Sequence, residues 1–342
     1  MTRGGVVVLW SNGQPALATH AFDDDGLELG RRLVEDWGDD RISTRHASVT
    51  CKHDRYTLTD LGSRNGTWVD DALRITGPTR LKLPALVRCG RSLFLVVEDL
   101  APYEGRSIIE RHRLVVGATL HEPCNQLDRA ILDEDSVAIV GPRWVARTLA
   151  RAYLAAHDGG TELHAESITT PLEHALAIGS PTKVVLLERP DLLAPDDLAT
   201  LRTWLETDVR FVTCVGREAE LDALPPEILR WLAPVTIRIT QPRYDELPSV
   251  VFSAVQRANL AMAIHSSAIS ELLIAARTRD EDDLLEVLGQ RIKLVQSLGE
   301  STLRAGAGYD TLSPVGDQAL ADRMPRSLRD VHMIPANWWN RR

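Results

Sequence analysis

The feature that most constrains the fold is a series of short strand-like runs across residues 5–100. These runs are rich in β-branched and aromatic residues, and they are Val6–Trp10, Ala47–Cys51, Arg55–Thr59, Thr67–Val69, Leu86–Cys89 and Leu93–Val97. Between them lie Asn-Gly, Asp-Gly and Gly-Ser sequences, which favour turns. Short strands with turns at regular spacing are typical of a β-sandwich. The sequence therefore predicts an all-β sandwich over residues 1–101.

A different pattern follows a linker at residues 102–112. Val137–Val140 and Lys183–Leu187 indicate strands that are buried on both faces, and helical stretches follow at Val145–Ala156 and Asp196–Glu206. Two more strand patterns come later along the chain, at Phe211–Val215 and Val235–Ile239. Alternating strands and helices predict an α/β domain with a parallel sheet over residues 113–245.

The last hundred or so residues have helical periodicity and then lose it. Apolar residues recur at helical spacing between Leu247 and Leu298, and they include Leu272, Leu273, Ala276, Leu284, Leu285 and Leu288. This pattern predicts a helical subdomain over residues 246–304. The tail, 305–342, mixes Gly, Pro and charge and ends near Trp338-Trp339, which would either cap the core or anchor a partner. It contains no complete helix-turn-helix pattern, so nucleic acid is not an expected partner.

Composition narrows the classes of function. The net charge of -9 and the pI near 5.6 disfavour broad attraction to nucleic acid phosphates. The four cysteines form no CxxC pair, and the histidines form no metal-ligand spacing, so we expect neither a metal nor a disulfide framework. The apolar runs are too short for a membrane span or a signal peptide. These features predict a soluble cytoplasmic protein.

Three islands in the first domain carry the chemistry of a phosphate site: Gly30-Arg31, Ser43–His46 and Gly62–Thr67. A bound phosphate ester needs cationic side chains, hydroxyl donors and free loop amides. Arg31, Ser43, Arg64 and the amides around Asn65 supply this set. Taken singly, each island is ordinary turn chemistry. Their order within one strand-rich segment favours a shared site.

Over residues 5–100 these islands resemble the forkhead-associated (FHA) domain, a module that reads phosphothreonine. The resemblance implies that Arg31 and Ser43 contact the phosphate, that Arg64 borders it, and that Asn65 holds the ligand backbone. It also implies structural roles for Gly30, His46, Gly66 and Thr67. The family usually has Arg directly after the Ser, whereas this chain has Thr44 and then Arg45. Both residues are included in the predicted phosphopeptide site.

The second domain resembles the AAA+ domain of sigma-54-dependent transcriptional activators over residues 106–300. The resemblance is carried by the order of 113–119, 127–132 and 136–141 and by the later strands. It implies a P-loop-like α/β fold with a helical lid at 246–304, and intersubunit arginines where Arg230, Arg238 and Arg243 stand. The expected fold class is therefore multidomain, with an all-β sandwich followed by an α/β domain and its lid.

The nucleotide motifs are degenerate. Residues 141–148 read Gly-Pro-Arg-Trp-Val-Ala-Arg-Thr, which puts Ala146 and Arg147 where a P-loop has Gly and Lys. Glu188 is followed by Arg189 where an Asp-Glu pair would bind magnesium. No GAFTGA-like loop, the element that engages sigma-54, occurs in 148–183. These changes predict a pseudo-ATPase that uses no cofactor, with Gly141, Arg147, Thr148 and Glu188 as the remnant of the site.

The sequence thus favours a bacterial signalling adaptor that binds a threonine phosphorylated by a Ser/Thr kinase. The degenerate AAA+ domain would serve as a scaffold, and the chain would form a homo-oligomer or join an AAA+ homologue. One alternative is a sigma-54-type transcriptional regulator that acts through its AAA+ surfaces. In another, Arg147 and Thr148 hold a nucleotide without hydrolysing it, or an unconventional site that includes Glu188 hydrolyses it.

Overall fold

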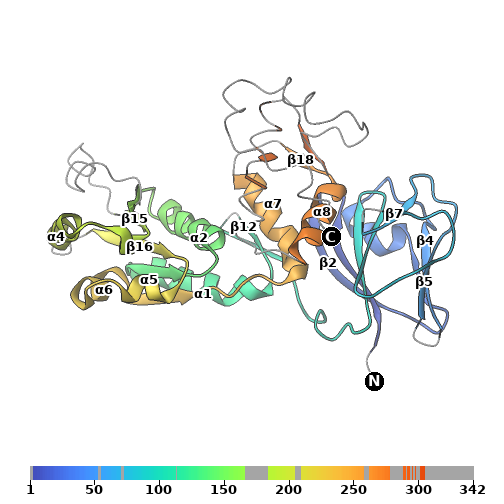
Figure 1. Cartoon of the computed structure of the whole chain (residues 1–342), viewed down its shortest axis with the longest axis horizontal. Coiled ribbons are helices and arrows are strands. Elements are labelled where there is room, and N and C mark those ends of the chain that lie inside the picture. Colours follow the sequence, from blue (N-terminus) through green and yellow to red (C-terminus); the bar gives the residue numbers. More distant parts are fainter. Residues whose placement is uncertain are drawn as a thin grey trace. The chain divides into compact units, whose positions relative to one another are not determined.

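The computed structural model divides the chain into two compact units, which are described separately (Figure 1). Residues up to Arg106 group with the described residues from Ala254 onward, and Ser107–Ser253 form the second unit. The structure describes residues 3–52, 55–70, 73–112, 114–165, 184–204, 209–257, 262–277, 288–289, 291–292, 295, 297 and 301–304. The predicted tail 305–342 and the helical positions Leu284 and Leu285 lie outside the described residues.

The first unit contains the predicted sandwich. One sheet has six antiparallel strands in the order β2 (Gln14–Ala21), β1 (Gly5–Ser11), β10 (Ser92–Val97), β9 (Ala85–Cys89), β6 (Thr67–Val69) and β7 (Leu73–Arg74). The other has four antiparallel strands in the order β3 (Leu27–Leu29), β4 (Ala47–Lys52), β5 (Arg55–Asp60) and β8 (Thr79–Arg80). A short 3-10 helix, η1 (Arg31–Trp37), follows β3. All six strands expected from the sequence are present, so the sandwich prediction is confirmed.

The sandwich core lies between the two sheets because alternate strand residues point inward. Val8 and Phe94 from the first sheet meet Val49 and Leu58 from the second, and all four are fully buried. Apolar burial of this kind contributes most of the stabilisation of a small domain.

The opposite face of the six-stranded sheet is buried as well. Five of its outward-facing side chains on β1, β9 and β10 are at most 1% exposed, namely Val7, Leu9, Leu86, Leu93 and Leu95, whereas Arg88 of β9 is partly exposed. Helix α8 (Ser266–Ala276) contacts these three strands (Figure 1). The sheet therefore packs between two apolar layers rather than facing solvent on one side.

The position of α8 differs from the predicted lid at 246–304. The strands that α8 contacts belong to the sandwich, and its Ile269 and Leu273 side chains are each 1% exposed. The apolar outer face of β1, β9 and β10 accounts for this arrangement, since α8 and the sheet each bury a face that water would disfavour. The short parallel pair β18 (Ala263–Ile264) and β19 (Thr302–Leu303) also belongs to this unit. Helix α7 (Leu247–Arg257) precedes it.

The second unit is the predicted α/β domain. Its five parallel strands lie in the order β14 (Thr161–His164), β15 (Val184–Glu188), β16 (Arg210–Val215), β13 (Val137–Val140) and β17 (Val235–Arg238). Among the described residues, its helices are α1 (His121–Asp133), α2 (Arg143–Ala156), α4 (Pro195–Trp204), α5 (Glu218–Asp222) and α6 (Pro226–Leu232). Short elements complete it: a hairpin of β11 (Ile109–Arg111) and β12 (Leu114–Val116), and 3-10 helices η2 (Ala118–Leu120), η4 (Pro190–Leu192) and η5 (Tyr244–Glu246).

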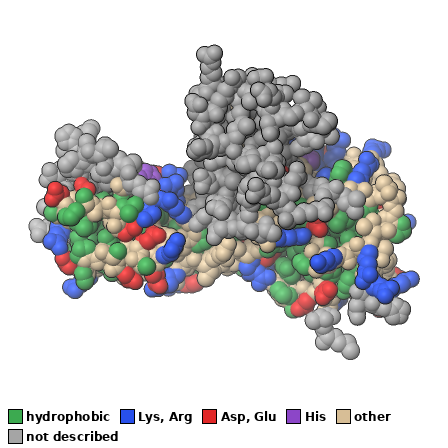
Figure 2. Space-filling model, in the orientation of Figure 1, with side chains coloured by type: hydrophobic (Ala, Val, Ile, Leu, Met, Phe, Trp, Pro, Cys, Tyr) green, Lys and Arg blue, Asp and Glu red, His purple; other side chains and the backbone are tan. Residues whose placement is uncertain are grey.

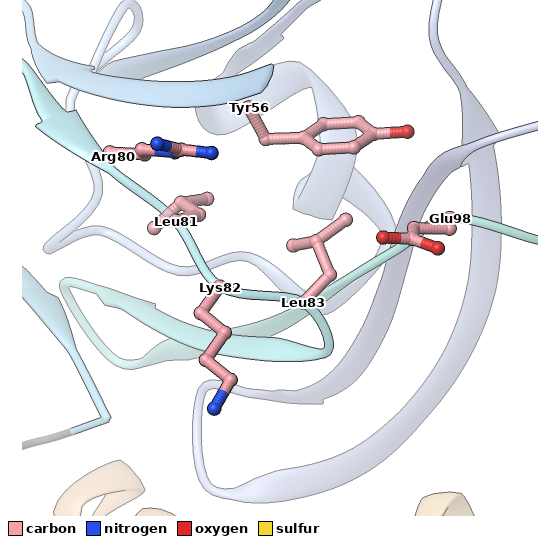
Figure 3. Close-up of a pocket in the computed structure, with 6 residues that line it drawn as sticks. All are labelled: Tyr56, Arg80, Leu81, Lys82, Leu83 and Glu98. Atoms are coloured by element: carbon pink, nitrogen blue, oxygen red, sulfur yellow. The ribbon is translucent and has the colours of Figure 1, made fainter. Parts of the chain in front are cut away.

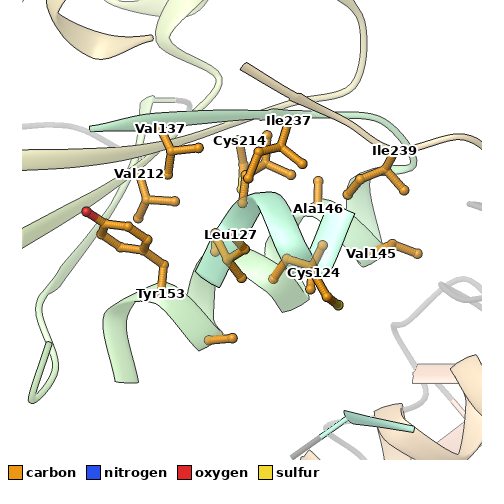
Figure 4. Close-up of a cluster of buried hydrophobic side chains, with 14 of the residues drawn as sticks. Cys124, Leu127, Val137, Val145, Ala146, Tyr153, Val212, Cys214, Ile237 and Ile239 are labelled. Carbon is orange, nitrogen blue, oxygen red and sulfur yellow. The ribbon is translucent and has the colours of Figure 1, made fainter. Parts of the chain in front are cut away.

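Apolar clusters cover both faces of this parallel sheet, as the sequence predicts. Leu127 of α1 and Tyr153 of α2 pack on one face, against β13, β16 and β17 (Figure 4). Leu201, Leu221 and Ile228 pack on the other. On the side seen in Figure 2, acidic and basic side chains are interspersed over this domain. No helix in the described part of the chain is long and apolar enough to cross a membrane.

We predict that Leu95→Ala destabilises the sandwich by about 2–5 kcal/mol, as a core leucine would, because its side chain is 1% exposed on β10, a strand that α8 contacts. Leu61→Ala is the control, since that side chain is 37% exposed and its loss should cost less than about 1 kcal/mol. Hydrogen exchange of the β4 and β5 amides measures the sandwich separately from the α/β domain. Equal costs for the two variants would contradict the packing described above.

Candidate phosphopeptide-binding site

The three islands predicted from the sequence meet at one end of the four-stranded sheet. Arg31 begins η1, where its backbone amide donates to Ser43 O at 3.2 Å and its Nη2 donates to Ile42 O at 3.2 Å. Gly30 allows this approach, since a Cβ there would lie 2.1 Å from Thr44 O. The guanidinium of Arg31 is thereby held beside the loop that carries Ser43.

Ser43 and His46 join the second island to the third. The Ser43 hydroxyl accepts a long hydrogen bond, 3.4 Å, from the Arg64 amide. His46 is fully buried, its Nδ1 accepts from Ser43 N at 3.1 Å, and its Nε2 lies 3.0 Å from Gly66 O. A carbonyl only accepts, so the proton is on Nε2 and the ring is neutral. Burial agrees with this state, because it lowers the pKa of His46 below its ordinary value.

Asp60 holds the third island in shape. One carboxylate oxygen accepts from the amides of Gly62 and Ser63 at 2.8 Å each, and the other accepts from the hydroxyls of Ser63 and Thr67 at 2.6 Å each. Burial alone would raise the pKa of Asp60, but these four donors outweigh it and lower the pKa to about 2. Sequence reasoning missed this residue, although an Asp two residues before a Gly is a signal for such a turn.

Asp39 fixes the loop at Arg41 and Ile42, whose carbonyl groups hold side chains of the site. It is 1% exposed, and its carboxylate accepts from Arg41 N at 2.8 Å, Arg91 N at 2.9 Å and the Ser92 hydroxyl at 2.7 Å. Arg41 O in turn accepts from Asn65 Nδ2 at 2.6 Å. Asp39 therefore determines where the Asn65 side chain is held. The sequence gives little signal for it, because Asp39-Asp40 resembles an exposed acidic pair.

The cationic side chains of the site differ in their partners. Arg31 and Arg64 are exposed, and neither is paired with a carboxylate among the described residues. Arg45 instead pairs with Glu28, with Nε and Oε2 2.7 Å apart. Thr44 is exposed and carries no charge. The structure thus brings Arg31, Ser43, Arg64 and Asn65 together, whereas the charge of Arg45 is already compensated.

A separate pocket lies at the other end of β5 (Figure 3). Its volume is about 460 Å³, and it is lined by Tyr56, Arg80, Leu81, Lys82, Leu83 and Glu98. Tyr56 and Asp60 stand at opposite ends of the strand, which separates them by roughly 13 Å at the usual rise of a β-strand. The pocket is therefore distinct from the three islands.

In the α/β domain, the connection that would form a P-loop is very short. β13 ends at Val140 and α2 begins at Arg143, so Gly141 and Pro142 alone connect them. The Gly141 amide donates to Val215 O at 3.1 Å, and Pro142 has no amide hydrogen. Neither residue has a backbone donor left for a phosphate. The connection therefore differs from a P-loop, in which backbone amides of the loop wrap the phosphates of a nucleoside triphosphate.

The charged remnants of the nucleotide site bind one another. Both carboxylate oxygens of Glu188, at the end of β15, accept hydrogen bonds from Arg147 of α2. His164 Nδ1 lies 2.8 Å from the same carboxylate. Burial alone would raise the pKa of Glu188, but Arg147 and His164 lower it. Thr148 is 8% exposed. Among the described residues, no three His, Cys, Asp or Glu side chains gather as a metal site would require.

Comparison with known proteins identifies the sandwich. Residues 28–90 match the family described as FHA domain. The N-terminal domain is an FHA domain. A solved FHA domain of protein CT664 from Chlamydia trachomatis is 30% identical, with 28% of this chain and 97% of that chain covered and a TM-score of 0.25. A structure from work on phosphothreonine-dependent FHA domain interactions is 24% identical, with 27% and 95% covered and a TM-score of 0.23.

Two further similarities are partial. RuvB of Thermotoga maritima, described as a Holliday junction branch migration motor, is 13% identical, with 56% of this chain and 67% of that chain covered and a TM-score of 0.39. A chloroplastic zeaxanthin epoxidase of Spinacia oleracea is 55% identical over 31 residues. That match covers 9% of this chain and only 5% of the epoxidase.

We predict that Asp60→Asn destabilises the FHA domain by about 2 kcal/mol near neutral pH, since hydrogen bonds to a charged acceptor are worth about 1.5–3 kcal/mol. The pKa of Asp60 is lower in the folded chain, at about 2, than its ordinary value of 3.8. The carboxylate therefore stabilises the fold above pH 3.8, and this contribution is lost as the pH falls toward 2. Urea unfolding of both proteins across this range measures the difference, and a difference that is independent of pH would contradict the prediction.

Proposed function

We propose that this protein is a signalling adaptor that binds a phosphorylated threonine on a partner protein and thereby recruits that partner. The observation that carries the proposal is the site at Arg31, Ser43, Arg64 and Asn65. Arg31 and Arg64 are exposed and have no carboxylate partner among the described residues, and the backbone amide of Arg64 contacts the Ser43 hydroxyl. A phosphate dianion would compensate these charges through charge-assisted hydrogen bonds.

Hydrogen bonds that hold the site residues in place favour a specific phosphopeptide site over a nonspecific anion site. Arg31 keeps one guanidinium bond to Ile42 O, and the Asn65 side chain is anchored on Arg41 O. Side chains that are fixed before binding lose less conformational entropy when the ligand arrives. In this proposal Arg31 and Ser43 contact the phosphate, Arg64 borders it, and Asn65 orients the peptide backbone. The partner is a substrate of a Ser/Thr kinase.

We further propose that the α/β domain serves as a scaffold and does not hydrolyse nucleotide. The short β13–α2 connection and the Arg147–Glu188 pair support this view. Phosphoryl transfer depends on positioned cations and free backbone donors. Here the cation that stands in the place of the P-loop lysine is bound to Glu188, so a nucleotide would have to break a buried ion pair to reach it.

We expect Arg31→Ala to weaken binding of a phosphothreonine peptide by about 10–100-fold, because a charge-assisted hydrogen bond worth about 1.5–3 kcal/mol is lost. Arg32→Ala is the matched control, since it removes the same exposed charge one residue away. The measurement is a titration with peptides selected from a phosphothreonine library and with their unphosphorylated forms. Equal affinity of the wild type for both forms would refute the proposed function.

We expect no saturable binding of a fluorescent ATP analogue up to millimolar concentration, with or without magnesium, and no phosphate release above background. Arg147→Lys should restore neither, because the amide cradle is still missing. Magnesium-dependent hydrolysis that Glu188→Ala abolishes would instead establish an unconventional ATPase. Binding without hydrolysis that Arg147→Ala abolishes would establish a nucleotide-holding site.

A further inference from the structure

We propose that helix α8 positions the phosphopeptide site, so that affinity for phosphothreonine depends on whether α8 is docked on strands β1, β10 and β9. The inference rests on the proposed function, because it concerns the same site. It assigns a role to a segment that follows the α/β domain in the chain, more than 150 residues after the FHA strands. Three observations support it: the apolar face on which the helix packs, the polar contacts at both ends of the helix, and a series of hydrogen bonds and close backbone contacts from the helix to the site.

The strand face that α8 contacts is mostly apolar, and so is one stripe of the helix. On the sheet side, Leu9 and Leu93 are 0% exposed although they point away from the sandwich core. On the helix side, Ile269 and Leu273 are each 1% exposed and Leu272 is 6% exposed. Such a face separates from its partner only at the cost of exposing both surfaces to water.

Polar contacts fix both ends of the helix along β9. At the carboxyl end, Arg277 Nη2 lies 3.1 Å from Asp70 Oδ1, and this carboxylate oxygen also accepts from Leu86 N at 3.1 Å. At the amino end, the His265 side chain caps the helix by accepting from Ser267 N at 3.2 Å. The neighbouring Ser266 is 1% exposed, and its hydroxyl donates to Gly90 O at 3.4 Å. These contacts fix the position of the helix along β9, with its amino end next to the β9–β10 turn.

The β9–β10 turn transmits this position to the phosphopeptide site. Gly90 lies so close to the Arg41–Ile42 backbone that a Cβ on it would come within 2.6 Å of Arg41 C. The next two residues of the turn, Arg91 and Ser92, donate to the carboxylate of Asp39, which also holds the Arg41 amide.

The two carbonyl groups of this supported loop hold two residues of the phosphopeptide site. Asn65 is anchored on the Arg41 carbonyl, and Arg31 is anchored on the Ile42 carbonyl. A shift of the turn would therefore move both anchors together. The segment that carries α8 follows Ser253, the last residue of the α/β domain, directly in the chain. The polypeptide therefore links the α/β domain to the helix that supports the phosphopeptide site.

The test uses the full chain and disturbs the packing of the helix with Leu273→Asp, which places a charge at a position of α8 that is 1% exposed. Leu132→Asp is the matched control, because that side chain is 81% exposed on α1. Hydrogen exchange reports whether α8 amides lose protection while β4 and β5 amides keep it. We expect the α8 amides alone to open and the affinity for the selected phosphothreonine peptide to fall at least tenfold. Unchanged affinity with an unprotected α8 would overturn the proposal.

If Leu273→Asp also opens β4 and β5, the graded variants Leu273→Ala and Arg277→Ala replace it. Peptide affinity should then fall in proportion to the opening of α8, and a lack of correlation would overturn the proposal. If the wild type does not distinguish phosphorylated from unphosphorylated peptide, the proposed function fails and this inference fails with it. If the wild type binds but undocking has no effect, this inference alone fails.

A second pair of variants tests the route through the turn. Gly90 and Gly38 have nearly the same positive φ, +61° and +64°. Alanine is strained at both because φ is positive, but only at Gly90 would its Cβ collide, since nothing lies within 4 Å at Gly38. We expect Gly90→Ala to weaken phosphopeptide binding at least fivefold without loss of α8 protection, and Gly38→Ala to leave binding unchanged. Equal affinities of the Gly90→Ala and Gly38→Ala proteins for the phosphopeptide would contradict a coupling through the β9–β10 turn.

Discussion

The buried carboxylate of Asp39 is the interaction on which the geometry of the FHA site depends. It accepts hydrogen bonds from one residue of the supporting loop and from two residues of the β9–β10 turn. A buried charge is stable only when its lone pairs are satisfied, so these three donors cannot move independently. The supporting loop and the turn therefore behave as one piece, and Arg31 and Asn65 are both anchored to it.

The two units treat their charged residues in opposite ways. In the FHA domain Arg31 and Arg64 are exposed without a carboxylate partner among the described residues, which leaves a cationic surface for an incoming anion. In the α/β domain Arg147 is bound by Glu188, whose carboxylate is almost completely buried. An anion that approached Arg147 would compete with a partner that is already desolvated. Arginine side chains are thus left without an acidic partner among the described residues of one unit and contribute to internal stability in the other.

Local patterns in the sequence were sufficient to predict the strands and the proximity of the three islands. Val6–Trp10 and Val137–Val140 are strands as predicted, and Arg31, Ser43 and Asn65 meet because turn residues place them at one sheet end. The role of Asp39 could not be predicted, since two of its three donors come from a turn 52 and 53 residues away and its own neighbours suggest an exposed loop. The role of Asp60 could be predicted in part, because an Asx turn is formed by residues that are close together in the sequence.

The position of α8 was the largest departure, and the strand residues contained a clue to it. A sandwich strand that faces water on one side alternates apolar and polar residues, whereas 6–10 and 93–97 are apolar at every position. Residues 1–101 alone would therefore expose a contiguous apolar face that soluble proteins rarely leave uncovered. A layer from elsewhere in the chain is required, and α8 supplies it. The FHA domain of this protein is thus physically completed by a helix that follows the α/β domain in the sequence.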